Sequence, residues 1–150
     1  MTLASFSDRV ALPTGHFTLE VRRAGALIER TDEANLVVTG ARNLLAGLLG
    51  GRRAAPGLAL MGFGTSMVAA DFGNAALLLP YTRPFEAVTY ADGTVTFGFA
   101  LPVGEANGLL IGEFGLLSAD GVLFARKTRT YAAIPKDINL SLSGTWSIQF

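Results

Sequence analysis

Residues 138–150 read Ile-Asn-Leu-Ser-Leu-Ser-Gly-Thr-Trp-Ser-Ile-Gln-Phe, and they indicate the fold class more clearly than any other part of the chain. Apolar side chains occupy the even positions except Gly144, and the odd positions are polar and uncharged. This period of two predicts a β-strand with one buried face, because successive side chains of a strand point to opposite faces. Gly144 keeps the phase and permits a bend or bulge. We expect the strand to stay in the core up to Phe150, with Trp146 and Ile148 among its core residues.

Two Asp-Gly dipeptides, at positions 92–93 and 120–121, separate apolar runs earlier in the chain. Asp-Gly between hydrophobic segments is the strongest short-range signal for a β-hairpin, because the turn needs residues that accept a left-handed backbone. Each dipeptide therefore predicts two antiparallel strands. The strands expected around the two turns are 85–90, 94–101, 110–118 and 122–129, and the core residues assigned to them are Phe97, Phe99 and Phe114.

Glu113 is an acid inside the apolar run 109–117. If Asp120-Gly121 forms a two-residue turn, Gly115 faces Arg126 and Glu113 is the diagonal neighbour of that arginine. We predict a structural ion pair between Glu113 and Arg126, because a half-buried acid needs a partner. A different loop length would break this register, and a catalytic role for Glu113 is the alternative.

The first part of the chain is expected to hold an arm followed by short strands. Alternation of apolar and polar residues over 17–22 predicts a strand, and Ala24-Gly25 is expected to turn the chain. A second strand is expected through Ile28 and a third over residues 35–38. Residues 1–16 show no sustained periodicity and contain proline and glycine, so we interpret them as an N-terminal arm.

A short helix is expected next, capped by Thr39, because a threonine hydroxyl can accept a backbone N–H from the first turn. Gly50 is expected to end it, and a loop then leads to a short strand over residues 58–61. This order of elements predicts one all-β domain over residues 17–150, an antiparallel β-sandwich or partly open barrel with one short α-helix. The apolar face of the helix is assigned to Leu44, Leu45, Leu48 and Leu49.

The composition excludes several classes of site and partner. The 150 residues include no cysteine, so neither a disulfide nor a thiolate zinc site can form. The formal net charge is +0, which removes the bulk electrostatic attraction to nucleic acid and anionic membranes. No apolar run approaches the roughly 18 residues of a spanning helix, and Asp8 stands where a signal peptide would be apolar. We expect no nucleic acid partner, no membrane partner and no signal peptide.

Hydrophobic residues make up 50% of the chain and charged residues 16%, whereas ordinary soluble domains carry about 25% charged residues. A surface with so few charges is stabilised when other subunits cover its apolar parts. The composition therefore favours a component of an assembly, either a homo-oligomer such as a trimer or a subunit present in several copies.

Residues suited to catalysis are scarce. His16 is the only histidine, so a nucleophile has one candidate base, and a metal would find one imidazole and no thiolate. The segment Gly62-Phe63-Gly64-Thr65-Ser66 lacks the third glycine and the lysine of phosphate-binding loops, and we interpret it as a bend after a strand. We assign no catalytic, cofactor-binding or metal-binding residue, and expect no cofactor and no enzyme activity. A small glycan hydrolase, which needs only two facing carboxylates, stays open as a less favoured alternative.

Three stretches of the sequence occur in a fixed order. The first is Val37-Val38-Thr39-Gly40-Ala41-Arg42-Asn43-Leu44-Leu45-Ala46. The second is Met61-Gly62-Phe63-Gly64-Thr65, followed by 69–71 and 81–83. The third comprises 105–108, 113–117, 120–126, 134–136 and 146–150. Together they resemble small virion proteins of tailed bacteriophages, akin to tail-collar fibre and baseplate proteins.

The resemblance implies a β-sandwich that acts as a structural component of a phage tail, as a baseplate or tail-fibre attachment protein. Its partners would be other tail and baseplate proteins, and it would be assembled in the host cytoplasm into the tail of the virion. Tail-fibre relatives continue into a long repetitive shaft, whereas this sequence stops at Phe150, which favours a compact adaptor. A host-receptor or glycan-binding module of the tail tip is the alternative.

Overall fold

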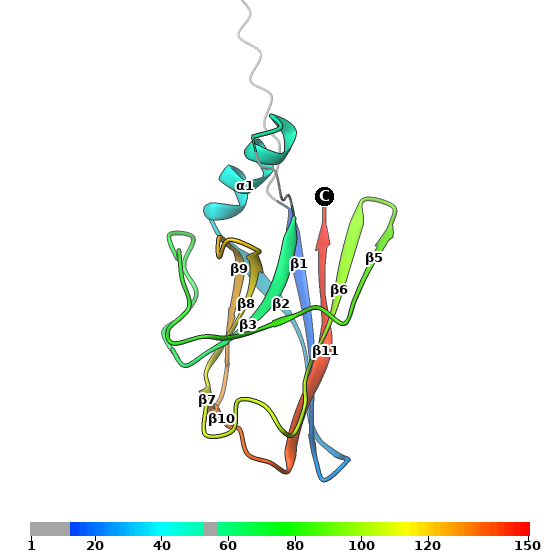
Figure 1. Cartoon of the computed structure of the whole chain (residues 1–150), viewed down its shortest axis with the longest axis vertical. Helices are drawn as coiled ribbons and strands as arrows, with labels where there is room; N and C mark the ends of the chain where they lie inside the picture. The colour runs from blue at the N-terminus through cyan, green and yellow to red at the C-terminus, as the bar shows by residue number, and fades with distance from the viewer. Residues whose placement is uncertain (1–12, 53–56) are drawn as a thin grey trace, which may run out of the picture.

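The computed structural model describes residues 13–52 and 57–150. In these residues nine strands form one strongly curled antiparallel sheet, a half-barrel, and one helix lies at its end (Figure 1). The predicted all-β fold class with one short α-helix is confirmed. The strands are β1 (Thr14–Arg23), β2 (Ala26–Val37), β3 (Leu58–Gly64), β4 (Tyr81–Pro84), β5 (Ala87–Ala91), β6 (Thr94–Leu101), β8 (Glu113–Ser118), β9 (Leu123–Thr128) and β11 (Leu140–Gln149), with β7 (Leu110–Ile111) and β10 (Ile134–Pro135) as a separate pair and α1 (Gly40–Leu49) as the helix.

Strand β2 joins the two halves of the sheet, whose order is β4-β3-β8-β9-β2-β1-β11-β6-β5. It pairs with β1 over most of its length, but with β9 only through Leu36 and Val37. Away from this short ladder, side chains bridge the seam between β2 and β9. The bridging ion pairs are Glu29 with Arg129 and Glu33 with Lys127.

The N-terminal strands are longer than the sequence pattern predicts. β1 starts at Thr14, which lies opposite Gln149 of β11, so residues 14–16 belong to a strand and not to the expected arm. Residues 1–12 of that arm lie outside the described residues, and Pro13 is buried just before β1. β2 is one continuous strand where two were expected, and that prediction was wrong. Backbone pairing with β1 and the seam ion pairs hold the middle of β2 in place. This part of the strand can therefore be rich in charged residues and lack an apolar face.

Both turns with two left-handed residues form tight hairpins. Ala24 and Gly25 have φ of 48° and 82°, and Asp92 and Gly93 have φ of 46° and 74°, as type I′ turns require. The strand expected over 85–90 was wrong in its bounds, because the chain leaves β4 at Pro84 and starts β5 at Ala87.

Helix α1 forms with a different start from the one expected. The Thr39 side chain makes no capping hydrogen bond, and its backbone is already helical, so the predicted threonine cap was wrong. Gly50 ends the helix, and its N–H donates to the carbonyl oxygen of Ala46. Leu44 is buried, whereas Leu49 is 91% exposed because it lies on the face of α1 that points away from buried Leu44 and Gly47.

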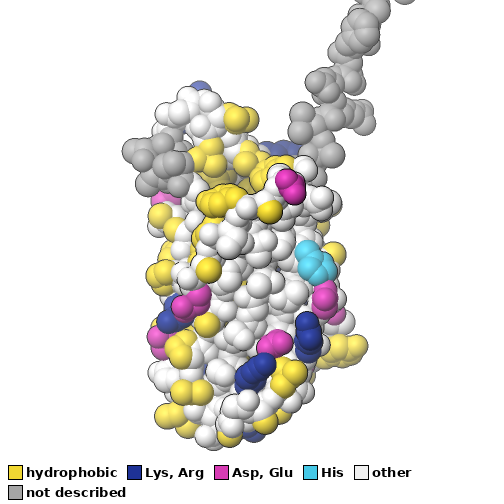
Figure 2. Space-filling model, turned by 90° about the vertical axis from the view of Figure 1, so that its right-hand side faces the viewer, with side chains coloured by type: hydrophobic (Ala, Val, Ile, Leu, Met, Phe, Trp, Pro, Cys, Tyr) yellow, Lys and Arg dark blue, Asp and Glu magenta, His cyan; other side chains and the backbone are white. Residues whose placement is uncertain are grey.

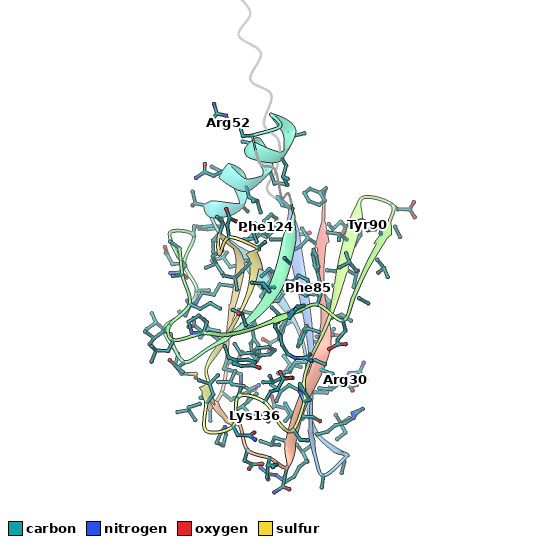
Figure 3. The ribbon with its side chains drawn as sticks, viewed as in Figure 1. Arg30, Arg52, Phe85, Tyr90, Phe124 and Lys136 are labelled. Atoms are coloured by element: carbon teal, nitrogen blue, oxygen red, sulfur yellow. The ribbon has the colours of Figure 1, made fainter. Side chains whose placement is uncertain are left out.

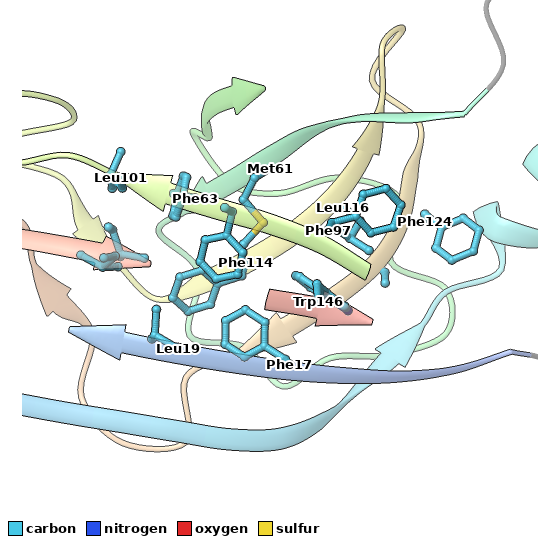
Figure 4. Packing of buried hydrophobic residues seen from close by; sticks show 14 of the residues in the cluster. Phe17, Leu19, Met61, Phe63, Phe97, Leu101, Phe114, Leu116, Phe124 and Trp146 are labelled. Atoms are coloured by element: carbon cyan, nitrogen blue, oxygen red, sulfur yellow. The ribbon is translucent and has the colours of Figure 1, made fainter. Parts of the chain in front are cut away.

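An aromatic cluster fills the half-barrel and links its two halves (Figure 4). The Phe17 ring lies 5.0 Å from both Trp146 and Phe114 and 5.7 Å from Phe99, measured between ring centroids. Phe114 comes from β8, in one half of the sheet, and the other three rings come from the opposite half, so the core is shared. The five residues assigned to the core from the sequence are all buried: Phe97, Phe99, Phe114, Trp146 and Ile148.

Strand β11 is shorter than the stretch of alternating apolar and polar residues, 138–150, that predicted it. Ile138 precedes β11 and is exposed, and Phe150 follows it and is 67% exposed, so the expectation of a core strand up to the final residue was wrong. Gly144 marks no bulge in the pairing of β11 with β1 and β6. A side chain there would overlap the carbonyl oxygen of Thr18, so glycine is needed for close approach.

Candidate protein interaction surface

The loop between β3 and β4, residues 65–80, lies over the outer face of β3, β8 and β9 and is called the covering loop below (Figure 1). The paired strands beneath it present glycine on that face. Gly62 lies opposite Gly115, and a Cβ atom at Gly62 would come within 2.5 Å of a methyl carbon of Leu77. The same leucine would lie 2.9 Å from a Cβ atom at Gly115. The two glycines thus make a flat bed in which Leu77 of the covering loop is buried.

Glu113 fastens the two ends of the covering loop. Its Oε1 accepts hydrogen bonds from the backbone N–H of Leu78 at 2.6 Å and of Ser66 at 3.3 Å. Its Oε2 accepts a hydrogen bond from Nε of Arg126 at 2.6 Å. Gly64 lies opposite Glu113 in the ladder and leaves the space that the carboxylate fills. The acid that interrupts an apolar run in the sequence is therefore satisfied by three donors.

Arg126 fastens the middle of the covering loop. Its Nη2 donates to the carbonyl oxygen of Val68 at 2.8 Å. Its Nη1 donates to Oδ1 of Asn74 at 3.0 Å and to the carbonyl oxygen of Ala69 at 3.3 Å. The structure thus brings the two predicted partners together and shows what they hold. The side chains of Glu113 and Arg126 are 1% and 4% exposed, so the pair is shielded from solvent.

The register that joins Glu113 and Arg126 has a different origin from the one assumed. Gly115 faces Arg126 and Glu113 faces Thr128, so Glu113 is the diagonal neighbour of Arg126 as expected, but the turn between the strands is longer than assumed. The N–H of Ser118 donates to the carbonyl oxygen of Val122, which leaves three residues in the loop instead of two. A register shift between Leu116 and Leu117 compensates for the extra residue. The two deviations cancel, and the arginine arrives where the simpler turn would have put it.

The covering loop exposes several apolar side chains. Five large hydrophobic side chains are exposed on it, although its backbone is held at the ends and the middle. Exposed large apolar side chains that gather in one segment of the chain, instead of being scattered singly, are typical of interaction sites. We call this set the apolar loop surface; its members are Met67, Val68, Phe72, Leu78 and Leu79.

A second apolar feature is a hollow of about 640 Å³ between α1 and the β5–β6 hairpin, called the α1 hollow below. Figure 2 shows hydrophobic side chains grouped at this end of the molecule, and Figure 3 places Phe124 and Tyr90 on opposite sides of it. Asp92 is the one charged residue among the described residues that line it. The hydrophobic residues that line it further include Leu44, Leu45, Leu48, Val88, Val95, Phe97, Ile148 and Phe150.

A buried lysine organises the opposite end of the half-barrel. Nζ of Lys136 donates to Oδ1 of Asn107 at 2.8 Å and to the carbonyl oxygens of Asp137 and Val103 at 3.0 and 3.2 Å. Burial lowers the pKa of Lys136, because the charged form loses its hydration. All three acceptors are neutral amide or backbone oxygens that hold the adjoining loop in place, so this lysine resembles Arg126 in being a structural cation.

The candidate catalytic and metal-binding residues of the sequence do not come together in one site. His16 pairs with Asp32 on the exposed surface of β1 and β2. Within residues 13–52 and 57–150, no group of three or more histidine, aspartate or glutamate side chains could hold a metal ion. The glycine-rich segment 62–66 was expected to bend, but Gly62, Phe63 and Gly64 lie within β3. A catalytic Glu113 would need access to substrate, which its burial under the covering loop denies.

Sequence reasoning found the ion pair but missed the surface. The sequence predictions concern only residues 65–66 and 69–71 of the covering loop, and nothing in its sequence reveals that Leu77 turns inward while Leu78 and Leu79 turn outward. A signal was present in the paired glycines of β3 and β8, because an interior strand with glycine on its outer face needs something to cover it.

Comparison of the chain with family models, with curated proteins and with solved structures gave no match. In the part of the chain that the structure describes, no helix has the length and apolar character needed to cross a membrane.

Proposed function

We propose that this protein is a structural component of a phage tail, a baseplate or tail-fibre attachment protein that works through protein–protein contacts. The observation that carries a role in assembly is the apolar loop surface, which is exposed and yet fixed from below by the Glu113–Arg126 pair. A fixed backbone reduces the entropy lost when a partner binds. The tail assignment itself rests on the sequence resemblance.

The residues of the resemblance supply much of the support beneath that surface. The covering loop packs on two glycines of these stretches and is held by an ion pair of the third. The glycines beneath Leu77 are Gly62 of the second stretch and Gly115 of the third, and Gly64 of the second leaves space for the Glu113 carboxylate, which pairs with Arg126. The resemblance therefore concerns residues with a shared physical task and is not confined to general β-strand patterning. This supports a common way of presenting the loop to neighbouring subunits.

A test of the tail assignment uses tailed particles produced from the genome that encodes this chain. Gold-labelled antibodies against the purified protein should mark one position on the tail, and mass spectrometry should find the chain in purified particles. Val68→Ser and Leu79→Ser, which change exposed residues, should reduce its incorporation while leaving the protein folded. Ala75→Ser, a change of another exposed loop residue with a small side chain, is the matched control. Particles that lack the chain altogether would refute the assignment.

A glycan-binding module is the second candidate, and exposed aromatic side chains favour it. Tyr90 and Phe150 lie on the rim of the α1 hollow, and Tyr131 is exposed elsewhere. Aromatic rings offer an apolar face to sugars, and Tyr90 adds a hydroxyl. Titration of the protein with host cell-wall and capsule glycans should then show binding that Tyr90→Ala removes. No binding at millimolar glycan would leave assembly as the sole proposal.

A further inference from the structure

The two edges of the nine-stranded sheet differ in how they are protected. β4, at one edge, has four residues and includes Arg83 and Pro84. A charge, a proline and a short strand are the usual means of keeping an edge from pairing with another chain. β5, at the other edge, reads Ala-Val-Thr-Tyr-Ala, has no charge and no proline, and is exposed at every position. β5 is therefore the edge open to an additional strand.

The hairpin geometry fixes which backbone groups of β5 are free. The two-residue turn at Asp92-Gly93 pairs Ala91 with Thr94, Thr89 with Thr96 and Ala87 with Gly98. In such a hairpin these alternate pairs exchange hydrogen bonds with β6. The intervening residues, Val88 and Tyr90, then direct their N–H and C=O groups away from β6. No strand within the described residues lies on that side of β5.

We propose that β5 pairs with β5 of a second copy, antiparallel and centred on Thr89, so that the two sheets continue into each other. This inference rests on the proposed role in assembly and names one partner for it. In this register Val88 lies opposite Tyr90 of the partner subunit, and Tyr90 lies opposite Val88 of the partner subunit. These are the residues whose backbone groups are free, so both pairs can form complete hydrogen-bonded pairs. The strand is thus self-complementary in its backbone.

The side chains fit the same register. Val88 is 40% and Tyr90 80% exposed, and both face the α1 hollow. A cross-strand pair of a β-branched and an aromatic residue is favourable, and each copy supplies one of each. The charges nearest the ends of the pairing are Asp92 and Glu86 of the partner subunit. Their repulsion is limited because Arg83 already pairs with Glu86 within each subunit.

The pairing has a definite symmetry. Two identical strands in antiparallel register are related by a two-fold axis, so the contact uses the same patch on both subunits and closes as a dimer. A trimer would need a different, head-to-tail contact. The proposal therefore expects an even number of copies wherever β5 is the contact.

Cysteine cross-linking tests the register directly, because the chain has no cysteine of its own. In the proposed dimer, Thr89 faces Thr89 of the partner subunit as a non-hydrogen-bonded pair with Cα atoms about 4.5 Å apart, which suits a disulfide. Thr89→Cys should therefore give a covalent dimer under mild oxidation. Val88→Cys is the matched control, since offset by two residues its two copies would lie roughly 8 Å apart, too far for a disulfide without backbone movement.

Two further variants test the contact without cross-linking. Val88→Pro removes an N–H that β6 does not use, and Tyr90→Lys places a charge in the apolar pair. Each should raise the dissociation constant of the dimer at least about tenfold, because a hydrogen bond is lost or an ammonium group must be desolvated. Thr82→Lys, at an exposed position of β4, is the control and should leave the dimer unchanged. Light scattering after size exclusion measures mass, and circular dichroism verifies folding of each variant.

The outcomes separate this inference from the proposed function. A wild-type dimer that both variants dissociate, with cross-linking at residue 89 and not at 88, supports the pairing. An oligomer that both folded variants leave intact overturns the pairing but still supports assembly through another surface. If the wild-type protein stays monomeric at all concentrations measured by light scattering and still enters tail particles through the apolar loop surface, the pairing alone is overturned.

Discussion

Nε of Arg126 on β9 lies 2.6 Å from Oε2 of Glu113 on β8, and the two buried side chains hold a loop of the chain rather than only each other. A buried pair of charges gains little net stability from Coulomb attraction, because both ions lose their hydration. The gain here comes from the loop backbone, whose N–H and C=O groups complete the coordination of both ions. Removing either side chain therefore leaves an unpaired buried charge and a loosened loop.

We expect Glu113→Gln and Arg126→Met each to lower the free energy of unfolding by about 3–5 kcal/mol, as loss of one partner of a buried pair does. A double-mutant cycle in chemical denaturation should give a coupling energy well above the roughly 0.2–1 kcal/mol of exposed pairs. The more solvent-accessible pair of Glu20 and Arg22 is the control, since its side chains are 31% and 36% exposed. If the effects of the two single substitutions were additive, Glu113 and Arg126 would not act as a coupled pair in holding the covering loop.

Gly64→Ala should destabilise the protein through the carboxylate that lies over Gly64. A methyl group there would overlap Oε1 of Glu113 and force the Glu113 side chain to move away from its hydrogen-bond partners. Overpacking of this kind costs about 1–3 kcal/mol in the free energy of unfolding. Gly104→Ala is the matched control, because nothing lies within 4 Å of a Cβ atom at that position. Equal stability of the two variants in urea unfolding would contradict the proposed packing.

The stability of the seam between β2 and β9 should depend on pH. A hydrogen bond from Arg129, opposed in part by burial, lowers the pKa of Glu29 below its ordinary value of 4.5. The folded state thus favours the ionised carboxylate, and the stabilisation is complete above pH 4.5 and is lost as the pH falls through the lowered pKa. The difference in unfolding free energy between wild type and Glu29→Gln should shrink over that range. In the background of Arg129→Met the same substitution should show a much smaller pH dependence.

Period-two patterning predicted the class of fold because the half-barrel core is built from alternating strands. Phe97, Phe99 and Trp146 lie on strands whose neighbours alternate with them, so the sequence alone places them inside. Phe17 alternates in the same way, and its ring contacts Phe114 of the other half of the sheet, as the ring of Phe99 contacts Phe63. Its central position depends on how the sheet curls, which a pattern along one strand does not contain.

The pattern failed where stability comes from partners distant in the sequence. The middle of β2 has no apolar face, since ion pairs with Lys127 and Arg129 and the ladder with β1 hold it. The cap expected at Thr39 was not formed, because the chain enters the helix through backbone bonds alone. The ion pair was found because an acid in an apolar run has few alternatives. The loop that it holds was missed, since backbone acceptors carry no signal in the sequence.

Trp146 and Phe150 occupy the same phase of the last strand, but we expect their truncation to differ sharply. Trp146 is fully buried between Phe17 and the β6 strand, whereas Phe150 lies beyond the strand and is exposed. Trp146→Ala should lower the free energy of unfolding by about 3–5 kcal/mol through the cavity it leaves. Phe150→Ala should change it by less than about 0.5 kcal/mol, as most surface substitutions do. Trp146→Phe should cost less than Trp146→Ala, since it keeps an aromatic ring and removes an indole N–H that has no hydrogen-bond partner in the described residues. Chemical denaturation of the three variants at one pH measures these differences, and a loss under about 1 kcal/mol for Trp146→Ala would show that its ring does not lie in the core.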